Sequence, residues 1–192
     1  MNAPLELEDA QARLLALAGT LPVEHLAIDE ALGHYLAAPL MARRTQPAAD
    51  LSAMDGYAVR ADDLAGPWRV VGESAAGHPF TGGIATGETV RISTGAPVPA
   101  GENAVLVQED CTRRGDVLTL TGDGPSPPDT HIRRKGMDFV EGTELLGAGV
   151  RIGPAQMALA ITAGHGHLPV RRRVRVAIID SGDELVGAGD DC

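Results

Sequence analysis

The segment Glu88–Asp110, ETVRISTGAPVPAGENAVLVQED, contains two short apolar runs separated by a loop with two prolines. Runs rich in β-branched residues and bounded by Gly, Pro or Asp are typical of strands. The same pattern of short apolar runs continues on both sides, from Ala58 to about Leu120, in the runs YAV, WRVVG and DVLTLTG. The sequence therefore predicts a compact β domain over this region, either a small barrel or a sandwich.

Helical patterns flank the β-rich region. Apolar residues recur at three-to-four spacing over Leu5–Ala18, which predicts a first helix. A second short helix is expected over Ile28–Leu36, and a third between Pro154, which suits a first helical turn, and Gly164. The run RRRVRVAIID at residues 171–180 predicts a strand, and SGDEL at 181–185 predicts the start of a helix. A strand followed directly by a helix opens an α/β domain.

Composition and charge exclude several classes of protein. The net charge of −10 argues against the basic surface that non-specific nucleic-acid or membrane binding requires. Cys111 and Cys192 are far apart and form no CxxC pair, so a disulfide framework or cysteine metal site is not expected. The acidic start lacks the features of a signal peptide, and no run of 18 apolar residues occurs. We expect a cytoplasmic protein with no nucleic-acid and no membrane partner.

Three loops carry polar residues with two open interpretations each. Asp55, in SAMDGYAVR, is either a turn residue or a functional carboxylate. Thr94 follows a predicted strand and precedes two prolines, so its rigid loop is either a plain strand exit or a holder of an oxyanion. The basic run Arg133–Lys135, followed by Asp138, is either a solvated charge run or a phosphate contact.

A fourth site lies at the expected helix start near the end of the sequence. Ser181 and Glu184 have the S-x-x-E spacing of a capping box, in which each side chain satisfies a backbone N–H group. The alternative is functional: Asp183 and Glu184 would lie where helix N–H groups gather, a position suited to anions or to Mg²⁺ between carboxylates and phosphates. Because two acids repel a bare phosphate, a nucleotide there would require a cation.

The order of these motifs resembles one protein family. The segments SAMDGYAVR, RISTGAPVPAGENAVLVQED, RRKGMDF, GPAQMALAITAG and VRVAIIDSGDEL are similar to the molybdopterin molybdenumtransferase family, which includes MoeA and the E domain of gephyrin. The resemblance runs from about Leu14 to Val186. The blocks SAMDGYA and STGAPVP are the most specific, and they favour the functional interpretation of their loops.

The resemblance implies an α+β fold in several domains. Residues 1–43 and 136–170 would form a split helical and mixed domain, and residues 44–135 an inserted small β domain, a barrel or sandwich. Residues 171–192 would be the first strand and turn of a truncated α/β domain of the MogA-like type. The family's later nucleotide loop, lysine-bearing segment and C-terminal domain are absent from this sequence, so we expect an N-terminal portion that is inactive alone.

The resemblance also implies an activity and its residues. Family members insert molybdenum from molybdate into adenylylated molybdopterin, with Mg²⁺, and release AMP. As homodimers they place the reaction between two subunits, and the molybdopterin adenylyltransferase is a further expected partner. Carried over by motif position, the catalytic residues are Asp55, Thr94, Asp138 and Glu184, the metal ligands Asp55 and Asp138, and the cofactor-binding residues Ser181, Gly182, Asp183 and Glu184. The alternative function is a non-catalytic dimerisation or scaffold module that keeps the fold.

Overall fold

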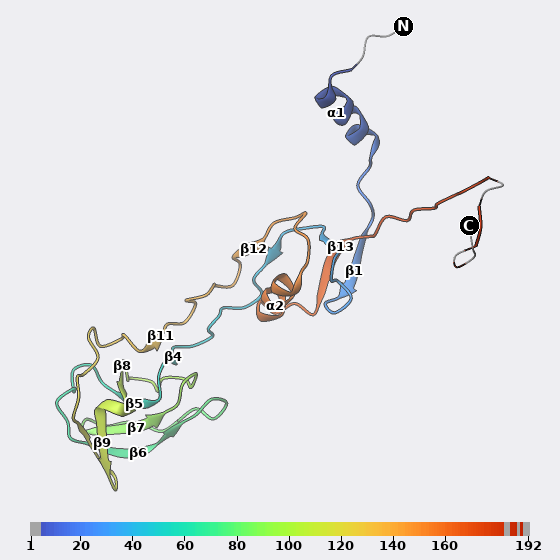
Figure 1. The fold of residues 1–192 in the computed structure, drawn as a ribbon. Helices are drawn as coiled ribbons and strands as arrows, with labels where there is room; N and C mark the ends of the chain where they lie inside the picture. The colour runs from blue at the N-terminus through green and yellow to red at the C-terminus, as the bar shows by residue number, and fades with distance from the viewer. Residues whose placement is uncertain (1–4, 183–184, 188, 190–192) are drawn as a thin grey trace. The chain divides into compact units, whose positions relative to one another are not determined.

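The computed structural model describes residues 5–182, 185–187 and 189. The chain divides into two compact units (Figure 1). The first unit draws its residues from Met1–Pro39, Leu146–Met157 and Gly166–Cys192, and the second from Leu40–Leu145 and Ala158–His165. Over these residues the fold is mostly β with two α-helices, so the expected β-rich region is present while the helical share is smaller than predicted. The proposed boundaries of the family's domains stay a prediction.

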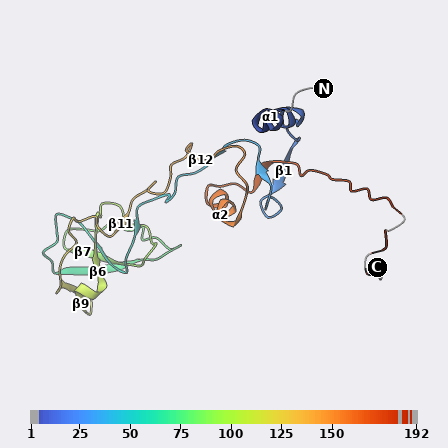
Figure 2. The same ribbon diagram turned by 45° about the horizontal axis from the view of Figure 1, so that its top comes forward.

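The second unit is built on one six-stranded sheet. Its strands β6, β7 and β9 lie together in both views of the chain (Figure 2). The sheet order is β8-β5-β7-β6-β10-β9, with all pairs antiparallel except the parallel pair β6–β7. The strands are β5 (Gly56–Val59), β6 (Trp68–Ser74), β7 (Glu88–Ile92), β8 (Ala104–Val107), β9 (Cys111–Arg114) and β10 (Val117–Leu120). The five predicted runs are confirmed as strands, in a single sheet.

Both faces of this sheet carry apolar side chains. Neighbouring residues of a strand point to opposite faces, and Tyr57 and Ala58 accordingly belong to different clusters of buried residues. Trp68, 1% exposed, lies in the first cluster, and its indole N–H donates to the carbonyl oxygen of Asp63 at 3.0 Å. Ile92 lies in the second cluster and is fully buried. Burial on both faces explains why the strands are apolar runs and not a polar–apolar alternation.

Short ladders complete the second unit. β4 (Leu51–Ser52) pairs antiparallel with β11 (Ile132–Arg133). β3 (Leu40–Met41) lies beside β12 (Glu144–Leu146), the last residue of which belongs to the first unit. A single 3₁₀ turn, η1 (Gln108–Asp110), follows β8. The β4–β11 ladder joins the loop that carries Asp55 to the basic run.

The first unit contains a three-stranded sheet in the order β1-β13-β2, formed by β1 (Val23–Ala27), β2 (Tyr35–Leu36) and β13 (His167–Arg171). The helix predicted over Ile28–Leu36 is wrong. The backbone makes turns in which Ala31 N–H donates to Ile28, and Gly33 then takes a φ of 80°. The Leu36 N–H donates to Val150, so the amides that a helix would need are used by another segment.

Both other helices are confirmed. α1 (Leu7–Leu17) has no buried residue, and α2 (Pro154–Thr162) is followed by Gly164 at a φ of 97°. No helix in the described part of the chain is long and apolar enough to cross a membrane.

The strand predicted at residues 171–180 is wrong for most of its length. β13 ends at Arg171, and residues 172–182 form no strand. Ser181 and Gly182 are not helical, while Asp183 and Glu184 lie outside the described residues, so the capping box stays a prediction.

Candidate functional site

Two of the sequence-predicted residues, Asp55 and Thr94, are in direct contact. The Asp55 Oδ1 accepts a hydrogen bond from the Thr94 backbone N–H at 2.7 Å and another from the Thr94 hydroxyl at 2.9 Å. Both residues are exposed, and 39 positions separate them in the sequence. The structure therefore joins the SAMDGYA and STGAPVP loops through a carboxylate and a hydroxyl.

The sheet brings these two loops together. Asp55 immediately precedes β5, Thr94 comes two residues after β7, and the antiparallel register sets Gly56 opposite Ile92. Gly56 is required by packing: a Cβ there would lie 1.9 Å from the carbonyl oxygen of Leu106 in β8. The glycine of the Asp-Gly pair thus allows a close backbone approach within the sheet, which replaces the interpretation of the pair as a simple turn.

The Asp55–Thr94 pair has a defined chemical state. The Thr94 N–H and then the Thr94 hydroxyl lower the pKa of Asp55, with a smaller contribution from the charge of Arg91. Asp55 is therefore an anion at neutral pH, and within the described residues its Oδ2 accepts no hydrogen bond. The Thr94 hydroxyl hydrogen is directed at Asp55, so it must rotate before it can donate to an incoming oxyanion.

Sequence reasoning missed two residues that hold the Asp55 loop. The Gln108 N–H donates to the Asp55 carbonyl oxygen at 3.0 Å. The Arg91 guanidinium donates to the carbonyl oxygens of Gly56 and Ile92, each at 2.8 Å, and to the Gln108 Oε1 at 2.7 Å. A signal was present in the sequence, because Arg91 is the one charged residue inside the apolar run TVRI.

Asp138, the third predicted residue, is not hydrogen-bonded to Asp55 or Thr94. Both of its carboxylate oxygens accept from the Arg133 Nη2, at 2.9 and 3.0 Å. The backbone N–H of Asp138 donates to the carbonyl oxygen of Gln46, which fixes its loop. Its convergence with Asp55 on one site stays a prediction.

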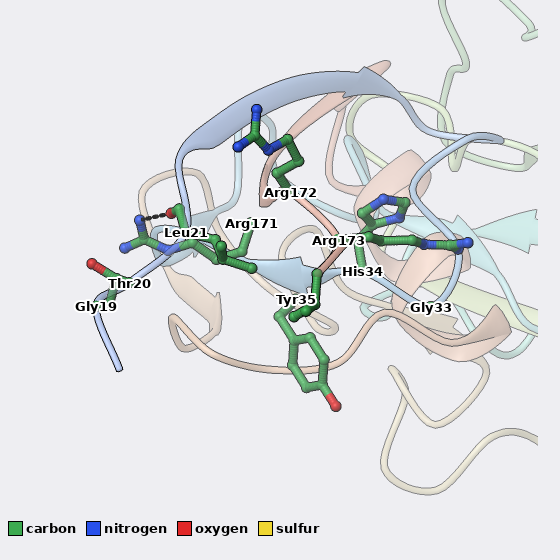
Figure 3. A pocket seen from close by; sticks show the side chains of 10 residues that line it. Gly19, Thr20, Leu21, Gly33, His34, Tyr35, Arg171, Arg172 and Arg173 are labelled. Carbon is green, nitrogen blue, oxygen red and sulfur yellow. Dashed lines mark hydrogen bonds between the residues drawn. The ribbon is translucent and has the colours of Figure 1, made fainter. Parts of the chain in front are cut away.

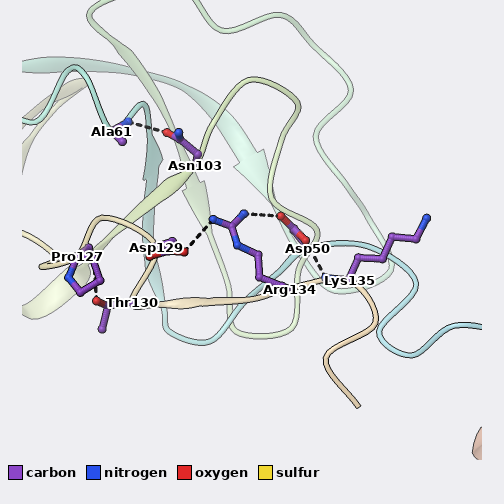
Figure 4. Close-up of polar contacts among 8 residues, drawn as sticks. All are labelled: Asp50, Ala61, Asn103, Pro127, Asp129, Thr130, Arg134 and Lys135. Atoms are coloured by element: carbon purple, nitrogen blue, oxygen red, sulfur yellow. Dashed lines mark hydrogen bonds and ion pairs between the residues drawn. The ribbon is translucent and has the colours of Figure 1, made fainter. Parts of the chain in front are cut away.

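Arg134 of the basic run is bound to carboxylates. It donates to Asp50 at 2.6 Å and to Asp129 at 3.2 Å, and the Lys135 backbone N–H donates to the other Asp50 oxygen at 2.7 Å (Figure 4). The Lys135 N–H and then Arg134 lower the pKa of Asp50. In the described residues the Lys135 ammonium has no ion-pair partner, and Figure 4 shows it directed away from this cluster. Of the three cations, Lys135 is the one available to a phosphate.

No group of three His, Cys, Asp or Glu side chains that could hold a metal ion occurs among the described residues. Asp183 and Glu184 lie outside these residues, so the predicted nucleotide and cation site at the SGDEL motif stays a prediction.

A cavity of about 430 Å³ lies in the first unit, beside His34, Tyr35 and the run Arg171–Arg173. Its size suits a small molecule. Arg171, however, donates to the Leu21 carbonyl oxygen, and Figure 3 shows the three guanidinium groups pointing in different directions. They do not converge on one point, so the arrangement is not that of an anion site.

Comparison with known proteins identifies the family. A family model of the MoeA N-terminal region (domain I and II) matches residues 5–164. The chain is 35% identical over 188 residues to the molybdopterin molybdenumtransferase of Haemophilus influenzae, covering 96% of this chain and 46% of that protein. It is 36% identical over 169 residues to molybdopterin molybdenumtransferase 2 of Mycobacterium tuberculosis, covering 84% and 41%.

A solved structure agrees with these relatives. The molybdopterin biosynthesis MoeA protein from Pyrococcus horikoshii superposes with a TM-score of 0.80 at 30% identity, covering 97% of this chain and 49% of the other. The chain thus spans about half the length of the relatives it matches. On these matches the chain belongs to the MoeA family of molybdenum cofactor biosynthesis, and it corresponds to the N-terminal region of the family's proteins.

Proposed function

We propose that this chain supplies one wall of the site at which molybdenum from molybdate is inserted into adenylylated molybdopterin, with release of AMP. The observation that carries the proposal is the Asp55–Thr94 contact, which joins the two most specific motifs of the family. The names of the relatives support the reaction class. Because the chain spans about half of those relatives, the opposite wall would come from the remaining domains.

The residues of this wall suit a reaction among oxyanions. The ionised Asp55 can accept hydrogen bonds from water, and Thr94 can turn its hydroxyl toward an oxygen of molybdate or phosphate. Asp138 would add a second carboxylate once a substrate anion competes for Arg133. Lys135, unpaired within the described residues, would meet a phosphate as a point charge.

The donor set also fits Mg²⁺. This ion is usually bound through one or two carboxylates, together with water and substrate phosphates. The Asp55 Oδ2 accepts no hydrogen bond in the described part of the chain, whereas both Asp138 oxygens are held by Arg133, so Asp55 would be the first ligand and Asp138 the second. When bound, the ion would neutralise negative charge on the adenylylated substrate.

Further parts of the proposal rest on the resemblance. Ser181, Gly182, Asp183 and Glu184 would meet the nucleotide side of the substrate. The protein would act in the cytoplasm as a homodimer, with the molybdopterin adenylyltransferase as a supplier of substrate.

Complementation tests the proposal. The chain is mixed with a polypeptide that carries the remaining domains of a relative, and molybdate-dependent cofactor formation is measured. We expect activity in the mixture, none with the chain alone, and none with Asp55→Ala. Asp116→Ala, at an exposed turn of the same unit, is the control and should remain active. Activity of the mixture that contains Asp55→Ala would contradict the proposed role of Asp55. Inactivity of every mixture would contradict the proposed enzyme function.

The exposure of α1 favours a second candidate, a dimerisation or scaffold module. The helix has no buried residue, and Leu14 and Leu17 are 67% and 83% exposed, as on a surface that binds another chain. A thermal shift separates the two functions. With Mg²⁺, adenylylated molybdopterin at 100 times its Kd should add about 2.7 kcal/mol to the stability of a substrate-binding chain. No shift in the complemented chain would favour the scaffold.

A further inference from the structure

We propose that Arg91 is a positioning residue that fixes the backbone on both sides of the Asp55–Thr94 contact. The inference rests on the proposed function, since it assigns Arg91 a role through Asp55. Arg91 belongs to β7 and is paired with Tyr57 of β5. Arg91 is three residues before Thr94 on β7, and its partner Tyr57 is two residues after Asp55 on β5.

The first arm of Arg91, its Nη1 amino group, links β5 and β7 beside the Asp55–Thr94 contact. Its Nη1 donates to the carbonyl oxygen of Gly56, the residue after Asp55, and to that of Ile92, two residues before Thr94. Both distances are 2.8 Å. The same nitrogen therefore binds one carbonyl oxygen beside the Asp55 loop and one beside the Thr94 loop. A shift of either loop would break one of these two hydrogen bonds.

The second arm reaches Asp55 through Gln108. The Arg91 Nη2 donates to the Gln108 Oε1 at 2.7 Å, and the Gln108 N–H donates to the carbonyl oxygen of Asp55 itself at 3.0 Å. The two peptide units that flank Gly56 are therefore held: the Asp55–Gly56 unit by Gln108 and the Gly56–Tyr57 unit by Arg91. This leaves the Asp55 side chain in the orientation that its Oδ1 needs to meet Thr94.

The chemistry favours arginine over other cations at this position. A guanidinium has five N–H donors in a rigid plane, whereas an ammonium is a compact charge on a flexible stem. The Arg91 guanidinium carbon lies 5.5 Å from the centroid of the Tyr57 ring, which holds the plane in place from one face.

The test is a comparison of kcat with KM, together with rescue by the conservative variant. The two constants are measured for molybdate in the complemented system. We expect Arg91→Met to lower kcat roughly tenfold to a hundredfold, with a smaller change in KM. Arg91→Lys should restore only part of kcat. Arg69→Met, in the neighbouring β6, is the control and should leave kcat and KM unchanged.

Two further variants keep the inference testable. If Arg91→Met does not fold, Gln108→Ala removes the second arm alone, and it should lower kcat with the Asp55–Thr94 loops otherwise intact. An unchanged kcat in either variant would overturn the positioning role. Asp55→Asn separates the two proposals: if it is fully active, the role of Asp55 fails, whereas an inactive Asp55→Asn beside a fully active Arg91→Met refutes only the inference about Arg91.

Discussion

Glu102 is a buried carboxylic acid in the loop before β8. It is 8% exposed, and no group of the described residues forms a hydrogen bond with its Oε2. Burial raises the pKa of Glu102 to about 7; Asp62 and Asp63 act in the same direction and Arg60 in the opposite one. The unfolded value is about 4.3, so between these two pH values the folded chain binds more protons than the unfolded chain. The contribution of Glu102 to the free energy of unfolding therefore falls as pH rises from about 4.3 to about 7.

Glu102→Gln should remove this pH dependence. The neutral amide has no charge to bury, so we expect the variant to be more stable than the parent at pH 8, by roughly 1–3 kcal/mol. The measurement is urea unfolding at a series of pH values. Glu141→Gln, an exposed change in the same unit, should keep the slope of the parent. A parent stability that is constant over this pH range would show that Glu102 is ionised in the fold.

Gly56→Ala should be strongly destabilising. The added Cβ would meet the Leu106 carbonyl oxygen at 1.9 Å, and a β8 backbone atom cannot move aside as a flexible side-chain end can. We expect a loss of about 3 kcal/mol. Gly83→Ala is the matched control, because nothing lies within 4 Å of its Cβ, and it should change stability by only about 0.5 kcal/mol. Equal urea midpoints for both variants would contradict the packing role of Gly56.

Asp55 and Thr94 were named through the resemblance of their motifs to the family, because local sequence left a turn and a plain strand exit open for them. Their roles stay a prediction, and their contact could not be foreseen. Their direct contact depends on the β5–β7 register, which pairs segments more than 30 positions apart. Arg91 was missed for the same reason, since its partners Gly56 and Gln108 become neighbours only when three strands assemble.

At the scale of elements, β13 contributes buried side chains to the core of the first unit, whereas α1 contributes none. Leu14 of α1 is 67% exposed, whereas Leu168 of β13 is 1% exposed. We expect Leu168→Ala to lower the free energy of unfolding by about 2–5 kcal/mol, and Leu14→Ala to change it by about 0.5 kcal/mol or less. Chemical denaturation of the two variants provides the measurement. A comparable loss for Leu14→Ala would show that α1 packs against a surface of the protein in solution.

A helix or strand could be predicted where the residues that determine it lie within its own stretch of sequence. α2 was predictable because Pro154 and Gly164 mark its ends within the sequence itself. The turns after Ile28 were mistaken for a helix because their amides are used by the distant segment around Val150. Residues 172–182 have strand-like composition, yet a strand exists only when paired, and no described strand pairs with them.

At the scale of the whole molecule, the net charge should determine how the stability of the protein changes with salt concentration. The chain carries 16 basic and 26 acidic residues, a net charge of −10, and self-repulsion of this kind destabilises a compact state. Ion pairs oppose it weakly, because pairs such as Arg60–Asp62 and Arg113–Asp116 are exposed to water, which screens their attraction.

We therefore expect the urea midpoint at pH 7 to rise when NaCl increases from roughly 0.01 M to 0.15 M, as the Debye length falls from about 30 to 8 Å. Near the isoelectric point of about 4.9 the net charge vanishes, and the rise should vanish with it. A midpoint that falls with salt at pH 7 would mean that the attraction within pairs such as Arg134–Asp50 outweighs the repulsion among the excess acids.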